Sequence, residues 1–305
     1  MSKYKYVLVD VFTKQAFGGN QLAVFTDARG LSDQQMQSVA KELNLSEVTF
    51  VLPPQDPAND FRVRIFTPAV ELPMAGHPTI GTAFVLARQG MLKSTGAEVV
   101  IRFEEKVGLI PVKLQFVNGL PDFIQMQQPA PTFGPRFSDY ATAARMLSLD
   151  IEMLDTDLPL EVVSCGVPIL FVPLKSLQAV RSVKFRQDVA ESMLEQAGTQ
   201  EVFVFTSETE YEGSTVHSRM FAPRIGIPED PATGGASGPL GCYMVRYNLI
   251  NPASTVKIVS EQGIEMNRPS FLYIEIDQTD TQITGVRVGG RCYFMGEGFL
   301  ELSEE

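Results

Sequence analysis

The feature that most constrains the fold of this 305-residue chain is an internal duplication. Four segments of the first half recur in the same order in the second half. The matched pairs are residues 19–25 with 166–172, 32–51 with 189–205, 64–68 with 219–223, and 76–81 with 230–235. One such match could arise by chance, because strands and Pro/Gly turns are common. Four matches in one order predict two diverged copies of a single unit.

The second matched pair predicts an amphipathic helix followed by a strand in each copy. Ser32 and Gln35 have the spacing of a capping box at the start of a helix. Apolar residues then recur at helical intervals through Leu43, which is typical of a helix with one buried face. The strands that follow begin at Glu47 and Glu201, so a carboxyl group opens the same strand in both copies.

The fourth matched pair leads into two segments that are apolar on nearly every side, residues 82–89 and 236–246. A helix without a polar face must be buried all round. We therefore predict an α+β fold with two pseudo-symmetric domains, each a curved, mostly antiparallel sheet or barrel around a central helix. The predicted domains are residues 1–118 with the C-terminal strands 285–305, and residues 119–284.

Composition excludes several classes of function. The net charge of −11 opposes nucleic-acid binding, which needs a basic surface. The longest apolar runs, such as Val167–Leu174, are too short to span a membrane. Three dispersed cysteines (Cys165, Cys242 and Cys292) predict neither a disulfide framework nor a zinc site. Because residues 1–12 lack a signal-peptide pattern, we expect a cytoplasmic protein with no nucleic-acid or membrane partner.

Motifs for common cofactors and metals are also missing. The sequence has no P-loop, dinucleotide fingerprint, HExxH pair or GxSxG elbow. We therefore expect no cofactor and no metal.

His77 and Asp230 are the matched candidates for a site, because equivalent positions of two copies can line one cleft and ligands favour domain interfaces. Other roles stay open for both residues. Asp230 before a proline is a good helix cap, and His77 could be a buried structural histidine. Gly76 and Gly234-Gly235 would let a substrate carboxylate approach helix N–H groups, or would only permit close packing.

Glu47 and Glu201 are candidates for acid/base chemistry. A carboxyl group in an apolar cleft has a raised pKa and can transfer protons. The symmetry of the two copies does not choose between them, and a solvated surface position is the alternative for each.

Five segments carry a family resemblance: VDVFTKQAFGGNQLAV, LSEVTFV, RIFTPAVELPMAGHPTIGTA, RMFAPRIGIPEDPATGGASGPL and QGIEMNRPS. Through them the chain resembles the PhzF-like (phenazine biosynthesis) isomerase family, which is related in structure to diaminopimelate epimerase. The resemblance implies a homodimer without cofactor or metal, whose site lies between the two pseudo-symmetric domains.

The resemblance also implies roles for single residues. It selects Glu47, in the strand-entry motif, as the general acid/base in place of Glu201. His77 and Asp230 match the histidine of the GHP motif and the aspartate of the DPATG motif. The expected substrate-binding residues are Asn20, Ser46, Gly76, Gly234 and Gly235.

Three departures from the family pattern bear on the reaction. No cysteine lies near the two helix starts, where the related epimerases keep a thiol pair, so inversion by thiols is disfavoured. Gly235 replaces a serine of the phenazine enzyme, and Gln21 replaces a proline, so a different substrate is expected.

We therefore predict an isomerase that moves a proton within a small carboxylate-bearing substrate. The alternatives are an epimerase or racemase without a cysteine pair, and a non-catalytic binding protein on the same scaffold.

Overall fold

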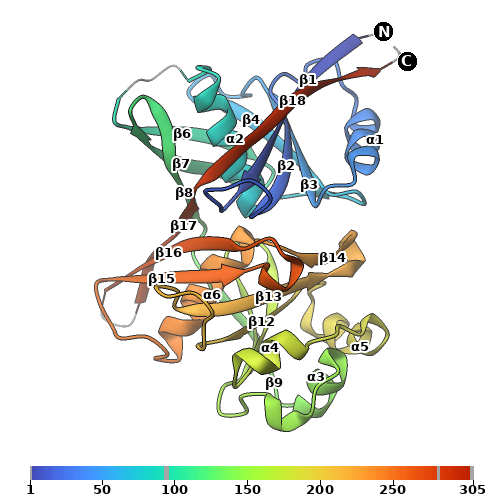
Figure 1. The fold of residues 1–305 in the computed structure, drawn as a ribbon, viewed down its shortest axis with the longest axis vertical. Coiled ribbons are helices and arrows are strands. Elements are labelled where there is room, and N and C mark those ends of the chain that lie inside the picture. The colour runs from blue at the N-terminus through green and yellow to red at the C-terminus, as the bar shows by residue number, and fades with distance from the viewer. Residues whose placement is uncertain (1, 93–95, 280–281, 303–305) are drawn as a thin grey trace. The chain divides into compact units, whose positions relative to one another are not determined.

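The computed structural model describes residues 2–92, 96–279 and 282–302. The chain forms two compact units: unit 1 is Met1–Gln127 with Gly289–Glu305, and unit 2 is Gln128–Val288. The chain passes from one unit to the other twice, within the strands β8 (Leu120–Gln128) and β17 (Gln282–Gly290) (Figure 1). The unit boundaries thus follow residues 127 and 288, whereas the sequence predicted them after residues 118 and 284.

Unit 1 is a mixed sheet with two associated helices, α1 (Asp33–Leu43) and α2 (Gly76–Arg88). Its other strands are β1 (Ser2–Val11), β2 (Asn20–Phe25), β3 (Glu47–Leu52), β4 (Phe61–Phe66), β5 (Glu71–Leu72), β6 (Glu98–Glu105), β7 (Gly108–Val117) and β18 (Cys292–Leu302). They pair in the order β18-β1-β2-β3-β4-β6-β7-β8, with β5 beside β4. Pairs β2/β3 and β4/β6 are parallel, and the other pairs are antiparallel.

Unit 2 repeats this arrangement. Its helices are α3 (Tyr140–Leu147), α4 (Leu177–Ser182), α5 (Gln187–Ala197) and α6 (Gly234–Arg246), with short 3-10 turns at Ile151–Met153, Pro223–Ile225 and Ile264–Met266. Its strands are β9 (Thr132–Phe137), β10 (Leu160–Ser164), β11 (Pro168–Pro173), β12 (Val202–Thr206), β13 (Val216–Ala222), β14 (Ile227–Asp230), β15 (Thr255–Gln262) and β16 (Ser270–Thr279).

The strand order in unit 2 is β9-β10-β11-β12-β13-β15-β16, with β14 beside β13. The parallel pairs are β11/β12 and β13/β15, which are the counterparts of β2/β3 and β4/β6. The predicted α+β fold with two pseudo-symmetric halves is confirmed by this shared order.

Each unit is built around one apolar helix (Figure 1). Helix α2 is buried from Gly76 to Leu86 and contacts β1, β2, β3 and β7. Helix α6 is buried over most of its length and contacts β10, β11, β15 and β16. The all-round apolar pattern predicted this burial, because such helices have no face to present to water.

Both core helices begin earlier than the sequence predicted. They start at Gly76 and Gly234, so the glycine-rich segments form their first turns. Each helix has 13 residues, and counting from the first makes His77 the counterpart of Gly235. Asp230 ends the preceding strand β14 instead. The predicted equivalence of His77 and Asp230 is therefore wrong, because the shared proline and threonine letters do not fall on the same turn of the two helices.

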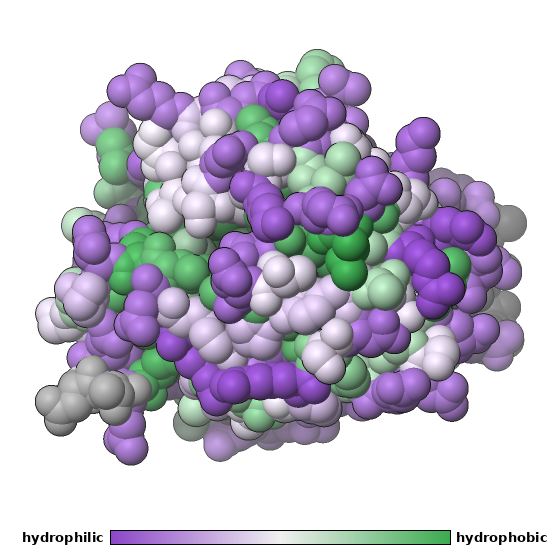
Figure 2. All heavy atoms as spheres, turned by 90° about the horizontal axis from the view of Figure 1, so that it is seen from below, coloured by the Kyte–Doolittle hydropathy of each residue, from purple (hydrophilic) through white to green (hydrophobic). Residues whose placement is uncertain are grey.

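Within the described part of the chain, no helix is both long and apolar enough to cross a membrane. Figure 2 shows one face of the molecule, on which hydrophobic side chains form small groups among hydrophilic ones. Unpartnered apolar groups of this size are common on protein surfaces.

Candidate active site

A tight turn positions Asn20 in unit 1. Gly19 has a φ of +62°, and a Cβ atom there would lie 2.2 Å from the carbonyl oxygen of Val11, so only glycine fits. The turn places Asn20 at the start of β2, where it is buried. Its amide nitrogen lies 3.0 Å from Nδ1 of His77. Asn20, expected to bind substrate, therefore also orients the His77 ring.

Glu47 and His77 meet in the interior of unit 1. Glu47 is the first residue of β3 and is 5% exposed, and His77 is the second residue of α2 and is 2% exposed. Oε2 of Glu47 lies 3.3 Å from Nε2 of His77. Nδ1 of His77 bonds to the Asn20 amide in a direction that depends on the tautomer of the ring, and Nε2 faces Glu47. Ser46, just before β3, is half-buried.

The imidazole of His77 is neutral at physiological pH. Burial lowers the pKa of His77 to about 3, and a backbone hydrogen bond with Gln21 opposes that shift only in part. The contact with Glu47 therefore joins a carboxyl group to a neutral imidazole and is not an ion pair. A neutral histidine can hold the Glu47 carboxyl group in one orientation without taking its proton.

Asp230 is held by neighbouring side chains in unit 2. It is 4% exposed, and its Oδ2 accepts a 2.5 Å hydrogen bond from the hydroxyl of Thr233. The amide of Gln262 donates to the carbonyl of Asp230 (2.7 Å) and to the Thr233 hydroxyl (3.0 Å), and its Oε1 accepts from the Thr233 N–H (3.0 Å). Thr233, and not Asp230, is the N-cap residue of α6. The helix-cap role considered for Asp230 is therefore not seen.

Glu201 lies beside Asp230. Burial raises the pKa of Glu201 to about 8, and the negative charge of Asp230 adds to the rise. Unit 2 thus has two carboxyl groups close to the start of its core helix, and unit 1 has a glutamate and a histidine close to the start of its own. Each unit keeps a carboxyl group at the entry of the equivalent strand, beside the mouth of its core helix.

The first turns of the two core helices offer N–H groups to an anion. Helix α2 begins after Ala75 and helix α6 after Thr233, and in the described chain neither start has a side-chain cap. The amides at Gly76, Gly234 and Gly235 are therefore not used by side-chain caps. Such helix starts favour carboxylates and phosphates through their dipoles and open N–H groups.

Thr233 and Gln262 were not predicted as site residues. Thr233 lies inside the DPATG motif, so its proximity to Asp230 could have been noticed. Gln262 is 29 residues from its partner Thr233, and the two meet because β14 and β15 both pair with β13. A single sequence contains no signal for that contact.

Residue types that ligate metals occur among the candidates, namely Glu47 and His77 in unit 1 and Asp230 in unit 2. The absence of a metal and the convergence of these three side chains on one substrate both stay predictions.

The cysteines have the environments of inert thiols. Cys165 and Cys242 are buried and free, and a hydrogen bond with Cys165, together with burial, raises the pKa of Cys242. Burial likewise raises the pKa of Cys292. Since the thiolate is the reactive form, the thiols of Cys242 and Cys292 are poor bases and nucleophiles.

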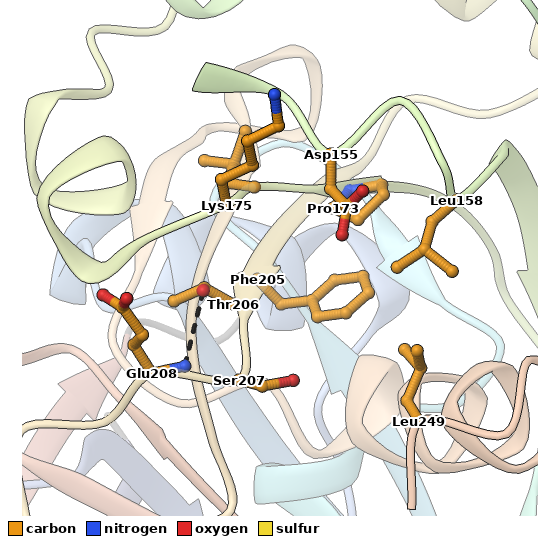
Figure 3. A pocket seen from close by; sticks show the side chains of 10 residues that line it. Asp155, Leu158, Pro173, Lys175, Phe205, Thr206, Ser207, Glu208 and Leu249 are labelled. Atoms are coloured by element: carbon orange, nitrogen blue, oxygen red, sulfur yellow. Dashed lines mark hydrogen bonds between the residues drawn. The ribbon is translucent and has the colours of Figure 1, made fainter. Parts of the chain in front are cut away.

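Unit 2 also contains a pocket of about 230 Å³ at the ends of β11 and β12 (Figure 3). Phe205, Leu158 and Leu249 give it an apolar wall, and Glu208 donates its N–H to the Thr206 hydroxyl at its edge. None of the predicted site residues lines it. We assign it no role in the chemistry.

Comparison with known sequences and structures points to one family. Residues 9–298 match the family described as phenazine biosynthesis-like protein (PhzC-PhzF). The trans-2,3-dihydro-3-hydroxyanthranilate isomerase of Pseudomonas aeruginosa is 34% identical over 305 residues, which cover 97% of this chain and 98% of that one.

Solved structures show the same fold. The PhzF-family protein of Bacillus anthracis has a TM-score of 0.90 and 28% identity, covering 99% of this chain and all of that chain. A hydroxyproline epimerase from Agrobacterium vitis has a TM-score of 0.65 at 12% identity, covering 98% of this chain and 91% of that one. At that identity the likeness concerns the fold alone.

Proposed function

The chain belongs to the phenazine biosynthesis-like (PhzC-PhzF) family, and from this premise we propose that it is an isomerase that moves a proton by general acid/base catalysis without a cofactor. The observation that carries the proposal is the buried Glu47 carboxyl group, 3.3 Å from the neutral imidazole of His77. A carboxyl group can act first as general base and then as general acid.

A single acid/base group is enough for the proposed double-bond shift. The Glu47 carboxylate takes a proton from a substrate carbon next to a double bond, and the C–H electron pair moves into the unsaturated system. The resulting carboxylic acid returns the proton to the far end of that system, and the double bond shifts. His77 orients Glu47 through the contact of its ring, and Asp230 orients the substrate. One residue suffices if the proton returns on the same face.

The helix starts would bind the substrate carboxylate. In unit 1 the first turn of α2 offers the amides of Gly76 and His77, and in unit 2 the first turn of α6 offers those of Gly234 and Gly235. The hydrogen bonds of Thr233 and Gln262 keep the start of α6 in place for this role. Asn20 and Ser46 complete the proposed set.

The substrate that we propose is small, unsaturated and carboxylate-bearing. Trans-2,3-dihydro-3-hydroxyanthranilate, named for the P. aeruginosa relative, has these features and is the first compound to test. Gly235 has no hydroxyl for the contact expected from the phenazine enzyme's serine, so a related acid is the preferred substrate. We further propose a cytoplasmic homodimer, as composition and the family resemblance suggest.

An epimerase is the second candidate, because the fold is shared with hydroxyproline epimerase. The buried, protonated thiols argue against the cysteine chemistry of such enzymes, so a Glu/Asp or Glu/His pair would have to replace it. A binding protein on the same scaffold is the remaining alternative.

Incubation with candidate carboxylic acids in D₂O separates the three functions. An isomerase transfers or exchanges one hydrogen and gives a product whose double bond has moved, which NMR detects directly. An epimerase labels and inverts a stereocentre without moving a double bond. Binding without label or product across a panel of such acids would support the binding protein and overturn the proposed function.

A further inference from the structure

Glu105, the last residue of β6, is a buried titratable group that the proposed reaction does not use. It is 7% exposed, and its Oε1 lies 2.6 Å from the hydroxyl oxygen of Thr79 in the first turns of α2. Its other oxygen, Oε2, has no hydrogen-bond partner among the described residues. A charged carboxylate in such a place would lack most of the donors that it needs.

The single proton of the Thr79 hydroxyl indicates the protonation state of the Glu105 carboxyl group. The Thr79 hydroxyl has one proton, and its oxygen lies 2.7 Å from the carbonyl oxygen of Ala75, which can only accept. If that proton is donated to Ala75, the contact with Glu105 is a hydrogen bond only when the Glu105 carboxyl group carries a proton and donates it. A carboxylate at this position would compete with Ala75 for the same proton.

The second copy of the fold has a neutral side chain at the equivalent position. Strands β6 and β15 both have eight residues and both pair in parallel, with β4 and β13 respectively. Aligned end to end, Glu105 matches Gln262. The residues before them match in contacts as well, since Glu104 accepts from two successive loop amides and so does Glu261.

Glu105 and Gln262 each contact a threonine near the start of the core helix in their unit. Gln262 holds the start of α6 through Thr233, and Glu105 meets the start of α2 through Thr79. An amide and a protonated carboxyl group have nearly the same shape, and both can donate one hydrogen bond and accept another. The duplication therefore provides an argument for a neutral Glu105 that is independent of proton counting.

We propose that Glu105 is a positioning residue that acts as a neutral carboxylic acid: through Thr79 it fixes the turn of α2 that carries His77. The effect on turnover rests on the proposed function, whereas the protonation state and the fixed turn do not. Glu105 itself does not touch the substrate.

Charged groups around Glu105 are engaged elsewhere. Arg64 on β4 bonds to Glu71, and Lys106 lies 3.9 Å from the same carboxylate. The other ionisable side chains on the surrounding elements are Arg62 on β4, Glu98, Arg102 and Glu104 on β6, Lys113 on β7, and Arg88 and the neutral His77 on α2. In the described residues none forms an ion pair with Glu105, so nothing nearby compensates a negative charge there.

Burial raises the pKa of Glu105 to about 8, and the hydrogen bond with Thr79 opposes the rise only in part. In the unfolded chain the group would titrate near its ordinary value of 4.5. The folded state therefore binds one more proton than the unfolded state between these values. The stability due to this proton is complete below pH 4.5 and is lost as pH rises through 8.

NMR of the protein with ¹³C-labelled glutamate side chains tests the protonation state directly. We expect a carboxyl resonance that titrates near pH 8, is missing from Glu105→Gln, and moves in Thr79→Val. A Glu105 resonance that titrates near pH 4.5 in the wild-type protein would overturn the proposal.

Urea unfolding between pH 5 and 8 gives a second readout, with Glu104→Gln as the matched control. Glu104 accepts from several donors that lower its pKa, so it stays charged throughout this range. We expect Glu105→Gln to change the pH dependence of stability by one proton, and Glu104→Gln to leave it as in the wild type. Equal pH dependence in Glu105→Gln and the wild type would contradict a neutral Glu105.

The positioning role is tested at Thr79, where serine keeps the hydroxyl and valine removes it. We expect Thr79→Val to shift the His77 ring resonances and to lower kcat by roughly tenfold to a hundredfold with little change in KM, and Thr79→Ser to restore both. If Thr79→Val leaves the His77 resonances unchanged, the positioning role is wrong. If those resonances shift but no tested acid is converted by the wild type, the positioning role stands and the proposed function fails.

Discussion

At the scale of single residues, the two histidines of this chain show that neighbouring side chains determine whether a buried imidazole is charged. His217 is fully buried between two carboxylates, with Nδ1 2.8 Å from Glu261 and Nε2 2.9 Å from Glu265. Burial alone would lower the pKa of His217, but the two glutamates raise it to about 9. His77 is similarly buried, and burial lowers its pKa to about 3, since the backbone hydrogen bond with Gln21 opposes that shift only in part.

We predict that neither histidine titrates between pH 5 and 8. Since His77 stays neutral and His217 stays charged in that range, their ring resonances should differ and should not move in an NMR titration. In urea both should titrate near pH 6.5, the ordinary value. A His77 resonance that moves with a midpoint between pH 5.5 and 7.5 in the folded protein would contradict its role as a neutral neighbour of Glu47.

The sequence singled out residues by chemistry but could not predict their partners. Glu47, His77 and Asn20 were selected from motifs, and the structure places their side chains together in unit 1. The contacts of Gln262 with Thr233 and of Glu105 with Thr79 join residues 29 and 26 positions apart. They depend on strand pairing and on protonation, neither of which leaves a local pattern in one sequence.

At the scale of elements, the apolar pattern of α2 and α6 predicted their burial but not their starts. Gly76-His77-Pro78 and Gly234-Gly235 have the composition of turns, and the sequence analysis assigned them to turns. Pro78 is tolerated there because the first turn of a helix has no carbonyl partner for its N–H groups. Tertiary packing, which local composition does not report, starts α2 at Gly76 instead of Thr82 and α6 at Gly234 instead of Ala236.

Small residues let α6 approach the sheet of unit 2. A Cβ atom at Gly241 would lie 2.8 Å from Cγ2 of Ile274 and 2.9 Å from Cδ1 of Ile276 on β16. Alanine should favour the helix by about 1 kcal/mol. Overpacking typically costs about 1–3 kcal/mol, so the clash should outweigh that gain.

We therefore predict that Gly241→Ala lowers the free energy of unfolding by about 1–2 kcal/mol, as measured by urea denaturation. Ser192→Ala on the exposed face of α5 is the control and should be neutral or slightly stabilising. A more stable Gly241→Ala protein would show that α6 can move away from β16 without cost.

At the scale of the whole molecule, the duplication was the most informative feature of the sequence. It predicted the shared strand order of the two units, because repeated segments in one order must repeat one topology. The sequence predicted a domain boundary after residue 118, whereas β8 continues through residue 127 as a strand of unit 1.

The two copies have diverged in chemistry while keeping their geometry. Glu47 and Glu201 enter equivalent strands, yet Glu47 meets a neutral histidine and Glu201 lies beside the carboxylate of Asp230. The central claim of this account is that the duplicated scaffold carries an asymmetric site, in which Glu47 moves the proton and Glu201 does not.

The most direct test compares the turnover of Glu47→Gln and Glu201→Gln with the substrate that the deuterium experiment identifies. The account predicts that Glu47→Gln loses about 10²–10⁴-fold in kcat while remaining folded, because its acid/base group is gone. Glu201→Gln should lose less than about tenfold, because Asp230 keeps its charge and its hydrogen bonds. Full turnover by Glu47→Gln, or equal losses in the two variants, would contradict the account.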